Sequence, residues 1–302
     1  MSTPLALDHT FDDRYGILTD VAPGIRRVLA PNPGPFTFNG TATHIVGRGR
    51  VAVIDPGPND DRHLNALLAA LKGETVSHIF LTHTHRDHSG GLQALAEATG
   101  AMVAGCRPLS LSSYSAANTG TVEAGHEPTY QPDHVLSDGE SVRGQDWSIM
   151  AIATPGHASN HLAFALDGTG ILFPGDHVMG WSTTVIAPPD GSLSDYMRSM
   201  DRLLARDDRL FLPAHGAPVT APRRLMRALK SHRRTREGSI RARLAAGDRT
   251  IAQIVEATYP GLDPRLKRAA GLSVLAHLID LVDRGLVISD SAPHLDGLFE
   301  PA

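Results

Sequence analysis

The sequence predicts an α/β fold followed by a small helical domain, and three observations lead to this prediction. Short apolar runs of strand length alternate with amphipathic helical patterns over roughly the first 220 residues. Loops rich in glycine, proline, histidine and aspartate follow several of these runs. Beyond about residue 220 the chain becomes mainly helical and rich in arginine. We therefore expect one domain over residues 1–220 and a second over residues 221–302.

The composition narrows the class of protein. The chain has 302 residues, 41% of them hydrophobic, and a formal net charge of −4, so nothing global demands a nucleic acid or a membrane. A single cysteine, Cys106, excludes an internal disulfide and a zinc–thiolate cluster, and its place after an apolar run predicts a buried thiol. No run approaches the roughly 20 apolar residues of a membrane helix. The N-terminus does not resemble a secretion signal, so we expect a cytoplasmic protein.

Apolar periodicity places the first strands and helices. Strand patterns cover residues 25–29, 43–46 and 50–54, and the last of these runs directly into Asp55. Leucines at helical spacing predict a helix over residues 61–71, which Gly73 ends. Another apolar run at residues 76–81 leads into a polar loop, and a helix pattern over residues 92–98 follows that loop. The loop thus lies between a strand and a helix.

This loop, residues 82–91, carries the chemistry of the first domain. It contains His83, His85, Asp87 and His88 within six positions. Imidazole and carboxylate groups bind zinc-like metals, and alternation in an extended segment puts His83 and His85 on the same side. Asp87 and His88 follow where the chain turns into the helix, so they can face a second point. The spacing suits two metals; the alternative is a polar surface loop that happens to be rich in histidine.

Further strands lead to three short motifs. Residues 107–145 predict loops, in which His126 and His134 are expected to be exposed to solvent. Strand patterns follow at residues 148–153, 161–166, 170–173 and 210–212, with a helix at 193–205. Pro-Gly-His ends at His157, Pro-Gly-Asp ends at Asp176, and Ala-His-Gly contains His215. Each motif directly follows a strand, and loops at the edge of a rigid sheet are where catalytic residues concentrate.

The loop and these motifs, in this order, resemble those of the metallo-β-lactamase-fold hydrolase superfamily. The resemblance spans most of residues 20–220 and implies an αββα sandwich. It implies that one metal binds His83, His85 and His157, that the other binds Asp87, His88 and His215, and that Asp176 bridges them. Asp55 resembles an aspartate that supports the metal loop through hydrogen bonds, the alternative being an ordinary Asp-Pro-Gly turn. His161 is a second supporting candidate, or simply a packed polar residue.

The second domain is basic at its start. Nine arginines and lysines lie between Arg223 and Arg243 in one helical stretch. Helix patterns at 250–257 and 265–283, and a strand at 286–288 after Gly285, predict a winged-helix-like module. The arginines are either a solvated helix face or a patch that attracts nucleic-acid phosphates. The two-part layout resembles the β-lactamase-like protein 2 type, whose characterised members resemble endoribonucleases that act on single strands.

The resemblance implies a metal-dependent hydrolase. Two divalent ions would hold a bridging hydroxide that attacks a carbonyl or a phosphorus atom, and Asp87 is expected to act as a metal ligand and a catalytic proton shuttle. Zinc is the expected metal, although nitrogen and oxygen ligands also admit iron or manganese. Zinc β-lactamases commonly have Cys or Ser at the position of Asp176. An aspartate there is more similar to what hydrolases of thioesters, lactones or phosphodiesters have at this position.

Three functions are compatible with these motifs. The leading one is hydrolysis of an ester or thioester, as in glyoxalase-II-like enzymes. The alternative is cleavage of single-stranded RNA, with the basic helix contacting the phosphates. The third is a nucleic-acid-binding regulator with a degenerate site, against which the intact set of seven expected ligands argues.

Overall fold

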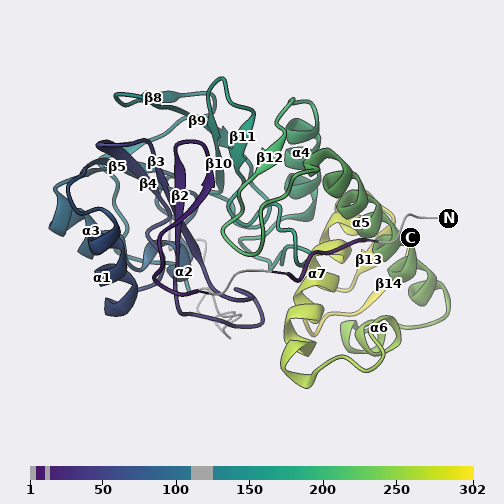
Figure 1. Ribbon diagram of the computed structural model, residues 1–302. Helices are drawn as coiled ribbons and strands as arrows, with labels where there is room; N and C mark the ends of the chain where they lie inside the picture. The colour runs from purple at the N-terminus through teal and green to yellow at the C-terminus, as the bar shows by residue number, and fades with distance from the viewer. Residues whose placement is uncertain (1–4, 11–13, 110–124) are drawn as a thin grey trace.

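Two β-sheets pack face to face between layers of helices, which confirms the expected αββα sandwich (Figure 1). The computed structural model describes residues 5–10, 14–109 and 125–302. The serine-rich part of the expected loop at 107–145 therefore lies outside the described residues. None of the helices in the described ranges is long and apolar enough to cross a membrane.

The first sheet has seven strands in chain order. They are β1 (Thr19–Ala22), β2 (Ile25–Leu29), β3 (Ala42–Val46), β4 (Arg50–Ile54), β5 (Thr75–Leu81), β6 (Met102–Gly105) and β7 (His134–Val135). The strands are antiparallel up to β4 and parallel from β4 onward. Parallel neighbours require crossovers. Helices α1 (Asp61–Ala70) and α3 (Leu92–Thr99) make two of them and cover the outer face of the sheet.

The second sheet has five strands in the order β12-β11-β10-β9-β8. They are β8 (Ser141–Arg143), β9 (Ser148–Ala153), β10 (Leu162–Leu166), β11 (Ile171–Phe173) and β12 (Leu210–Phe211). Between the sheets, Phe80 of β5 and Phe164 of β10 meet edge to face with ring centroids 5.3 Å apart. Both rings are fully buried. Burial of each contributes roughly 1.5–3 kcal/mol, so this contact helps to fix the two sheets together.

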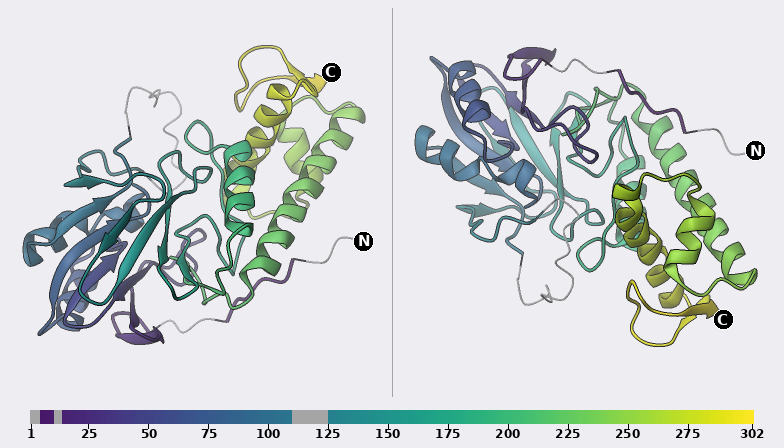
Figure 2. Two further views of the ribbon diagram at one scale, coloured as in Figure 1. Left: turned by 90° about the horizontal axis from the view of Figure 1, so that it is seen from above. Right: turned by 90° about the horizontal axis from the view of Figure 1, so that it is seen from below.

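The C-terminal helices pack against the outer side of the second sheet. Figure 2 shows α4 (Leu193–Leu204) and α5 (Pro222–Ala245) side by side there. Leu225, Met226 and Leu229 in the first half of α5 share a buried cluster with residues of α4 and the sheet. Ile240 and Leu244 in its second half belong to a separate cluster of C-terminal residues. Helix α5 thus contributes to two cores, and the domain boundary at residues 220 and 221 stays a prediction.

The expected winged-helix-like module is also present. It contains α6 (Ile251–Thr258), a short 3-10 turn (Pro264–Leu266), α7 (Lys267–Asp283) and the paired strands β13 (Val287–Ser289) and β14 (Phe299–Pro301). Thr250 caps α6 together with Gln253 in a capping box, which explains why that helix begins there. The cluster that includes Ile254, Leu278 and Phe299 forms the core of this module.

Four short strands are not predicted from the sequence. The prediction of loops throughout residues 107–145 is wrong for β7 and β8, and β1 and β14 are also not predicted. These strands have two to four residues, and every side chain except that of Phe299 is exposed or partly exposed, so they lack a continuous apolar run. Cys106, in contrast, is buried as predicted, with 1% of its surface exposed.

Candidate metal centre

The loop after β5 places its four expected ligands inside the protein. β5 ends at Leu81, and the chain then turns through His83 and His85 into a single helical turn, α2 (Arg86–Ser89). His83, His85 and His88 are buried, while Asp87 at the start of α2 keeps some exposure. The sequence pattern therefore folds as expected, as a strand followed by a tight loop and a helix.

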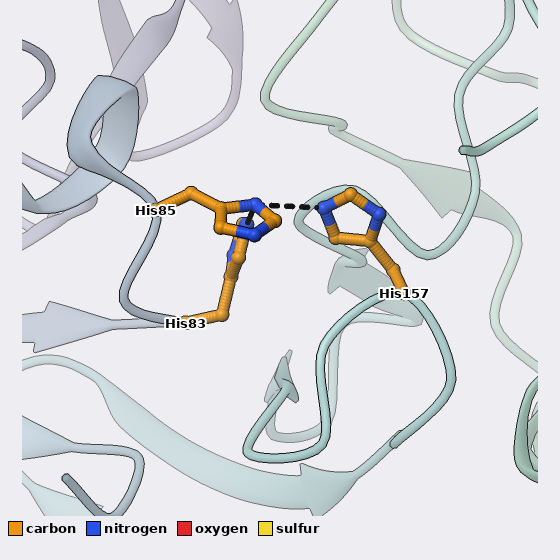
Figure 3. A group of neighbouring side chains, drawn as sticks. All are labelled: His83, His85 and His157. Carbon is orange, nitrogen blue, oxygen red and sulfur yellow. Dashed lines mark hydrogen bonds between the residues drawn. The ribbon is translucent and has the colours of Figure 1, made fainter. Parts of the chain in front are cut away.

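Three imidazoles from both sheets converge on one point. Figure 3 shows the rings of His83, His85 and His157 turned toward each other. Nε2 of His83 lies 2.9 Å from Nδ1 of His85, and Nε2 of His157 lies 3.0 Å from the same atom. Nitrogen ligands around a tetrahedral zinc ion are about 3.3 Å apart, given zinc–nitrogen distances of roughly 2.0–2.1 Å. The spacing of these three nitrogens is close to what a metal ion requires.

A second group lies beside the first. Oδ2 of Asp87 is 3.3 Å from Nε2 of His88 and 3.2 Å from Nε2 of His215. Asp176 reaches both groups: its Oδ1 lies 3.5 Å from His88 and 3.3 Å from His215, and its Oδ2 lies 3.7 Å from His157. One carboxylate thus faces two clusters, with a different oxygen toward each.

The facing atoms fit a cation. Nε2 of His88, Nε2 of His215 and Oδ1 of Asp176 are buried and have no hydrogen-bond partner among the described residues. Burying polar atoms without partners is costly, so they are normally satisfied by a ligand, a water or a metal. Imidazole nitrogens and carboxylate oxygens are ligands that divalent transition metals prefer. The residues present therefore fit the metals implied by the sequence.

Hydrogen bonds on the outer side fix four of the histidine rings. In each of these rings Nδ1 is bonded to the protein, which leaves Nε2 directed into the site. The bonds are His83 to Oγ1 of Thr82 at 2.9 Å, His88 to Oδ2 of Asp55 at 2.9 Å, His157 to the Val185 carbonyl at 2.7 Å and His215 to the Gly40 carbonyl at 3.1 Å.

Asp55 lies behind the metal loop, where the sequence predicts a supporting carboxylate. Its Oδ1 accepts a hydrogen bond from the Thr82 backbone N–H at 2.9 Å, and its Oδ2 accepts from the Thr82 hydroxyl at 2.8 Å and contacts His88. The backbone of Asp55 has a φ of 51°, in the left-handed region that aspartate tolerates better than most residues. One buried side chain thus joins the end of β4 to the loop after β5.

The two Pro-Gly motifs are explained by close packing. A Cβ on Gly175 would lie 2.6 Å from Nε2 of His161, and one on Gly156 would lie 2.4 Å from Cα of Tyr196. His161 occupies the space next to Gly175 and accepts a hydrogen bond from the Asp176 backbone N–H at 3.2 Å. His161 therefore contacts the backbone of the expected bridging residue rather than facing the two clusters directly.

The charges in the site favour a cation. Burial lowers the pKa of His83 well below its ordinary value, so this imidazole is neutral. Burial opposes the charge of His88 and His215, but the neighbouring carboxylates outweigh it; they raise the pKa of His88 well above its ordinary value and that of His215 to about 10. Burial likewise opposes ionisation of Asp87 and Asp176, yet the adjacent imidazoles lower both pKa values. Carboxylates that favour a proton on these imidazoles would also favour a metal ion bound to them.

One neighbour of the site is not indicated by the sequence. His126, expected to be exposed, keeps only 10% of its side-chain surface, so that expectation is wrong. Its ring centroid lies 4.6 Å from that of His85, its Nδ1 is 2.8 Å from Oγ1 of Thr84, and its Nε2 is 3.5 Å from Asp190. No pattern connects Asp190 with His126, because the contact depends on the packing of two distant loops. His134 is 44% exposed, as predicted.

Comparison with known proteins agrees with this arrangement. The family model of the metallo-beta-lactamase superfamily matches residues 36–215, and that of the beta-lactamase associated winged helix domain matches residues 250–294. The lactamase-like protein adaB of Aspergillus niger (strain ATCC MYA-4892 / CBS 513.88 / FGSC A1513) is 29% identical over 262 residues, which cover 81% of this chain and 76% of that protein. The atrochrysone carboxyl ACP thioesterase of Aspergillus terreus (strain NIH 2624 / FGSC A1156) is 27% identical over 285 residues, or 88% of this chain and 81% of that one.

A solved structure is similar over nearly the whole chain. The crystal structure of a metallo-beta-lactamase family protein from Thermus thermophilus has a TM-score of 0.76 and 25% sequence identity, and the match covers 94% of this chain and 100% of that one. The superfamily model alone spans more than half of the 302 residues. This chain therefore belongs to the metallo-beta-lactamase superfamily of hydrolases and carries the winged helix domain associated with it.

Proposed function

We propose that the protein is a dinuclear metal-dependent hydrolase of thioesters. The observation that carries this proposal is the position of Asp176, whose two carboxylate oxygens face separate groups of ligand atoms. His83, His85 and His157 would hold the first proposed metal, Asp87, His88 and His215 would hold the second, and Asp176 would offer one carboxylate oxygen to each. The thioester class is supported by the relative from Aspergillus terreus, whose name is a carboxyl ACP thioesterase.

When bound, the two divalent ions supply Lewis acidity and activate water at neutral pH. We propose zinc, and the same ligand atoms would accept iron or manganese. Asp87 is the proposed proton shuttle because its side chain keeps 20% exposure, whereas His88 and His215 keep 0% and 1%. Asp87 could therefore take a proton from the attacking water through Oδ1, the oxygen that does not face His88 and His215, and pass it to a departing thiolate while the buried imidazoles hold their positions. Asp55 and His161 would keep the ligands oriented from behind.

Single-stranded RNA is the weaker alternative. Several cations of the basic stretch are already engaged within the protein. Arg223 pairs with Asp207, Arg243 pairs with Asp248, and Lys230 is a buried partner of Asp201. Internal partners reduce the positive charge that remains to attract phosphates. The structure thus gives the RNA hypothesis less support than the nine cationic residues between Arg223 and Arg243 suggest in the sequence.

The test is hydrolysis of an acyl-N-acetylcysteamine thioester by metal-loaded protein, followed as release of thiol. Labelled single-stranded RNA is incubated in parallel. Asp176→Ala should lower kcat/KM by at least 100-fold, or about 3 kcal/mol, because it removes the group shared by both proposed metals. Asp87→Ala should lose turnover while it stays folded. The exposed Asp167 provides the matched control, and Asp167→Ala should retain full activity.

Each outcome separates the hypotheses. Thioester hydrolysis that Asp176→Ala abolishes, without RNA cleavage, supports the proposal. RNA cleavage that is lost in the same variant would replace it with the nuclease alternative. Normal turnover by a folded, metal-loaded Asp87→Ala protein would remove Asp87 from its role as proton shuttle.

A further inference from the structure

We propose that Arg233, on helix α5 of the C-terminal region, is a positioning residue for His157 and Asp176. The inference rests on the proposed function, because it takes these two residues as metal ligands. It concerns a side chain that contacts neither of them directly. Arg233 acts through Thr184 and Val185, a pair of residues that we call the 184–185 strap.

Arg233 lies in a buried environment. Only 5% of its surface is exposed, although it lies in a helix whose other arginines are mostly at the surface. Its guanidinium donates a hydrogen bond to the backbone carbonyl of Thr184 and lies 5.4 Å from the centroid of the Tyr196 ring. No carboxylate in the described ranges forms an ion pair with it. Burying a charged group is costly unless polar or aromatic contacts compensate it. Here the Thr184 carbonyl and the face of the Tyr196 ring provide this compensation.

The other side of the strap contacts Asp176 and His157. The hydroxyl of Thr184 lies 2.8 Å from the Asp176 carbonyl oxygen and 3.1 Å from that of His177, and donates to them. The next carbonyl, that of Val185, accepts the hydrogen bond from Nδ1 of His157 at 2.7 Å. The strap therefore contacts the backbone of one proposed ligand and the ring of another. Arg233 holds it from outside.

Tyr196 packs against both ends of this connection. Tyr196 of α4 lies under the guanidinium, and its ring centroid is 4.5 Å from that of His177, the residue after Asp176. The backbone of Tyr196 also abuts Gly156, the residue before His157. Helices α4 and α5 thus approach the two ligand motifs of the second sheet together. A shift of α5 would be transmitted to the strap through this hydrogen bond as well as through the buried apolar contacts of the helix.

The contrast with its neighbour makes this testable. Arg234 follows Arg233 in the same helix, yet its side chain is exposed to solvent. The two residues share their type, their helix and their local charge. They differ in contact with the strap. Arg234 is therefore a matched control for every measurement on Arg233.

The experiment compares Arg233→Met, Arg233→Lys, Thr184→Val and Arg234→Met in the full chain. Metal affinity is measured by competition with a chromophoric chelator for zinc. The absorption bands of bound cobalt(II) report the geometry of its ligands, and unfolding of the metal-free protein reports stability. We expect roughly 10-fold weaker metal binding and altered cobalt bands in Arg233→Met, as for other residues that orient metal ligands. Arg233→Lys should recover part of both, and Arg234→Met should match the wild-type protein.

Thr184→Val keeps the carbonyl that Arg233 uses but removes the hydroxyl, so it should weaken metal binding in the same direction. Arg233→Lys against Arg234→Met decides the question if Arg233→Met does not fold, and weaker metal binding in Arg233→Lys alone would support the proposal. Lower stability with unchanged affinity and cobalt bands in Arg233→Met would overturn the proposal and reduce Arg233 to a packing residue. A wild-type protein that binds less than one ion per chain would overturn the ligand set as well. A protein that binds metal but hydrolyses no thioester would leave the role of Arg233 intact.

Discussion

Replacing Asp55 with asparagine tests how the metal loop is held. Asparagine has nearly the same shape as aspartate and also tolerates the left-handed φ of 51° found here. It can still accept the Thr82 N–H through its remaining oxygen. The other oxygen, which lies 2.9 Å from Nδ1 of His88 and accepts the Thr82 hydroxyl, becomes an NH2 group that only donates.

The expected cost can be estimated from these contacts. The Thr82 hydroxyl can rotate and accept a hydrogen bond from the new amide, so the free energy lost at this contact is small. Nδ1–H of His88 would face a second donor inside a buried site, and a lost hydrogen bond to a charged acceptor costs about 1.5–3 kcal/mol. The metal-free Asp55→Asn protein should therefore lose about 2–3 kcal/mol of its free energy of unfolding. Metal affinity should fall by roughly 10- to 100-fold, because His88 loses the partner that orients its ring.

Urea unfolding of the metal-free protein, followed by circular dichroism, measures the first quantity, and competition with a chelator measures the second. Asp20→Asn is the control: Asp20 is 73% exposed, and its change should shift the unfolding free energy by less than about 0.5 kcal/mol. Wild-type metal affinity in a folded Asp55→Asn protein would refute the reasoning. Asp55 would then be an ordinary turn residue and His88 would be oriented by other contacts.

Three further predictions concern other parts of the chain. Burial lowers the pKa of His277 to about 3 in the folded protein. Below the ordinary pKa of histidine the unfolded chain therefore binds one more proton than the folded protein, and stability is lost as pH falls. His277→Leu should reduce the decline in unfolding free energy between about pH 7 and pH 5 by about 2 kcal/mol. Urea unfolding at both pH values measures this, and an unchanged slope would contradict it. Burial raises the pKa of the Cys106 thiol, so Ellman's reagent should label it only in denaturant; rapid labelling of the native protein would show that the thiol is accessible. Gly156→Ala should weaken both folding and metal binding because its Cβ would meet the Tyr196 backbone, whereas Gly73→Ala, also at positive φ but in open space, should affect stability alone. Chelator competition distinguishes these two variants.

The convergence of the seven expected ligand residues could be predicted because all of them lie in short motifs. Four of them lie within six residues, and each remaining one directly follows a strand with a strong apolar pattern, as β9, β11 and β12 have. Strands of one sheet end near each other, so side chains just beyond them are brought together even though the chain separates them. The structure does bring all seven together in two adjoining groups.

What the sequence could not indicate depends on burial and on distant contacts. Arg233 and Arg234 look alike in the sequence, and only the packing of α5 against the 184–185 strap distinguishes them. His126 and Asp190 meet through loops that carry no periodic pattern. The short strands, such as β7, have too few residues to show alternation, and they form because a neighbouring strand offers free hydrogen-bonding groups.

The proposed metal centre also has a mechanical consequence. His85 follows a strand of the first sheet and His157 a strand of the second, 72 residues later, so an ion bound by both would act as a clasp across the open edge of the sandwich. A covalent cross-link that closes a loop of that length would lower the entropy of the unfolded chain and stabilise the folded state by roughly 4 kcal/mol. The middle of the sandwich is held by side-chain packing, such as that of Phe80 against Phe164, which needs no metal. Withdrawal of the metal should therefore let the sandwich part first at this edge, and amide exchange should quicken at the loop ends of β5, β9 and β11 before it does in the aromatic centre.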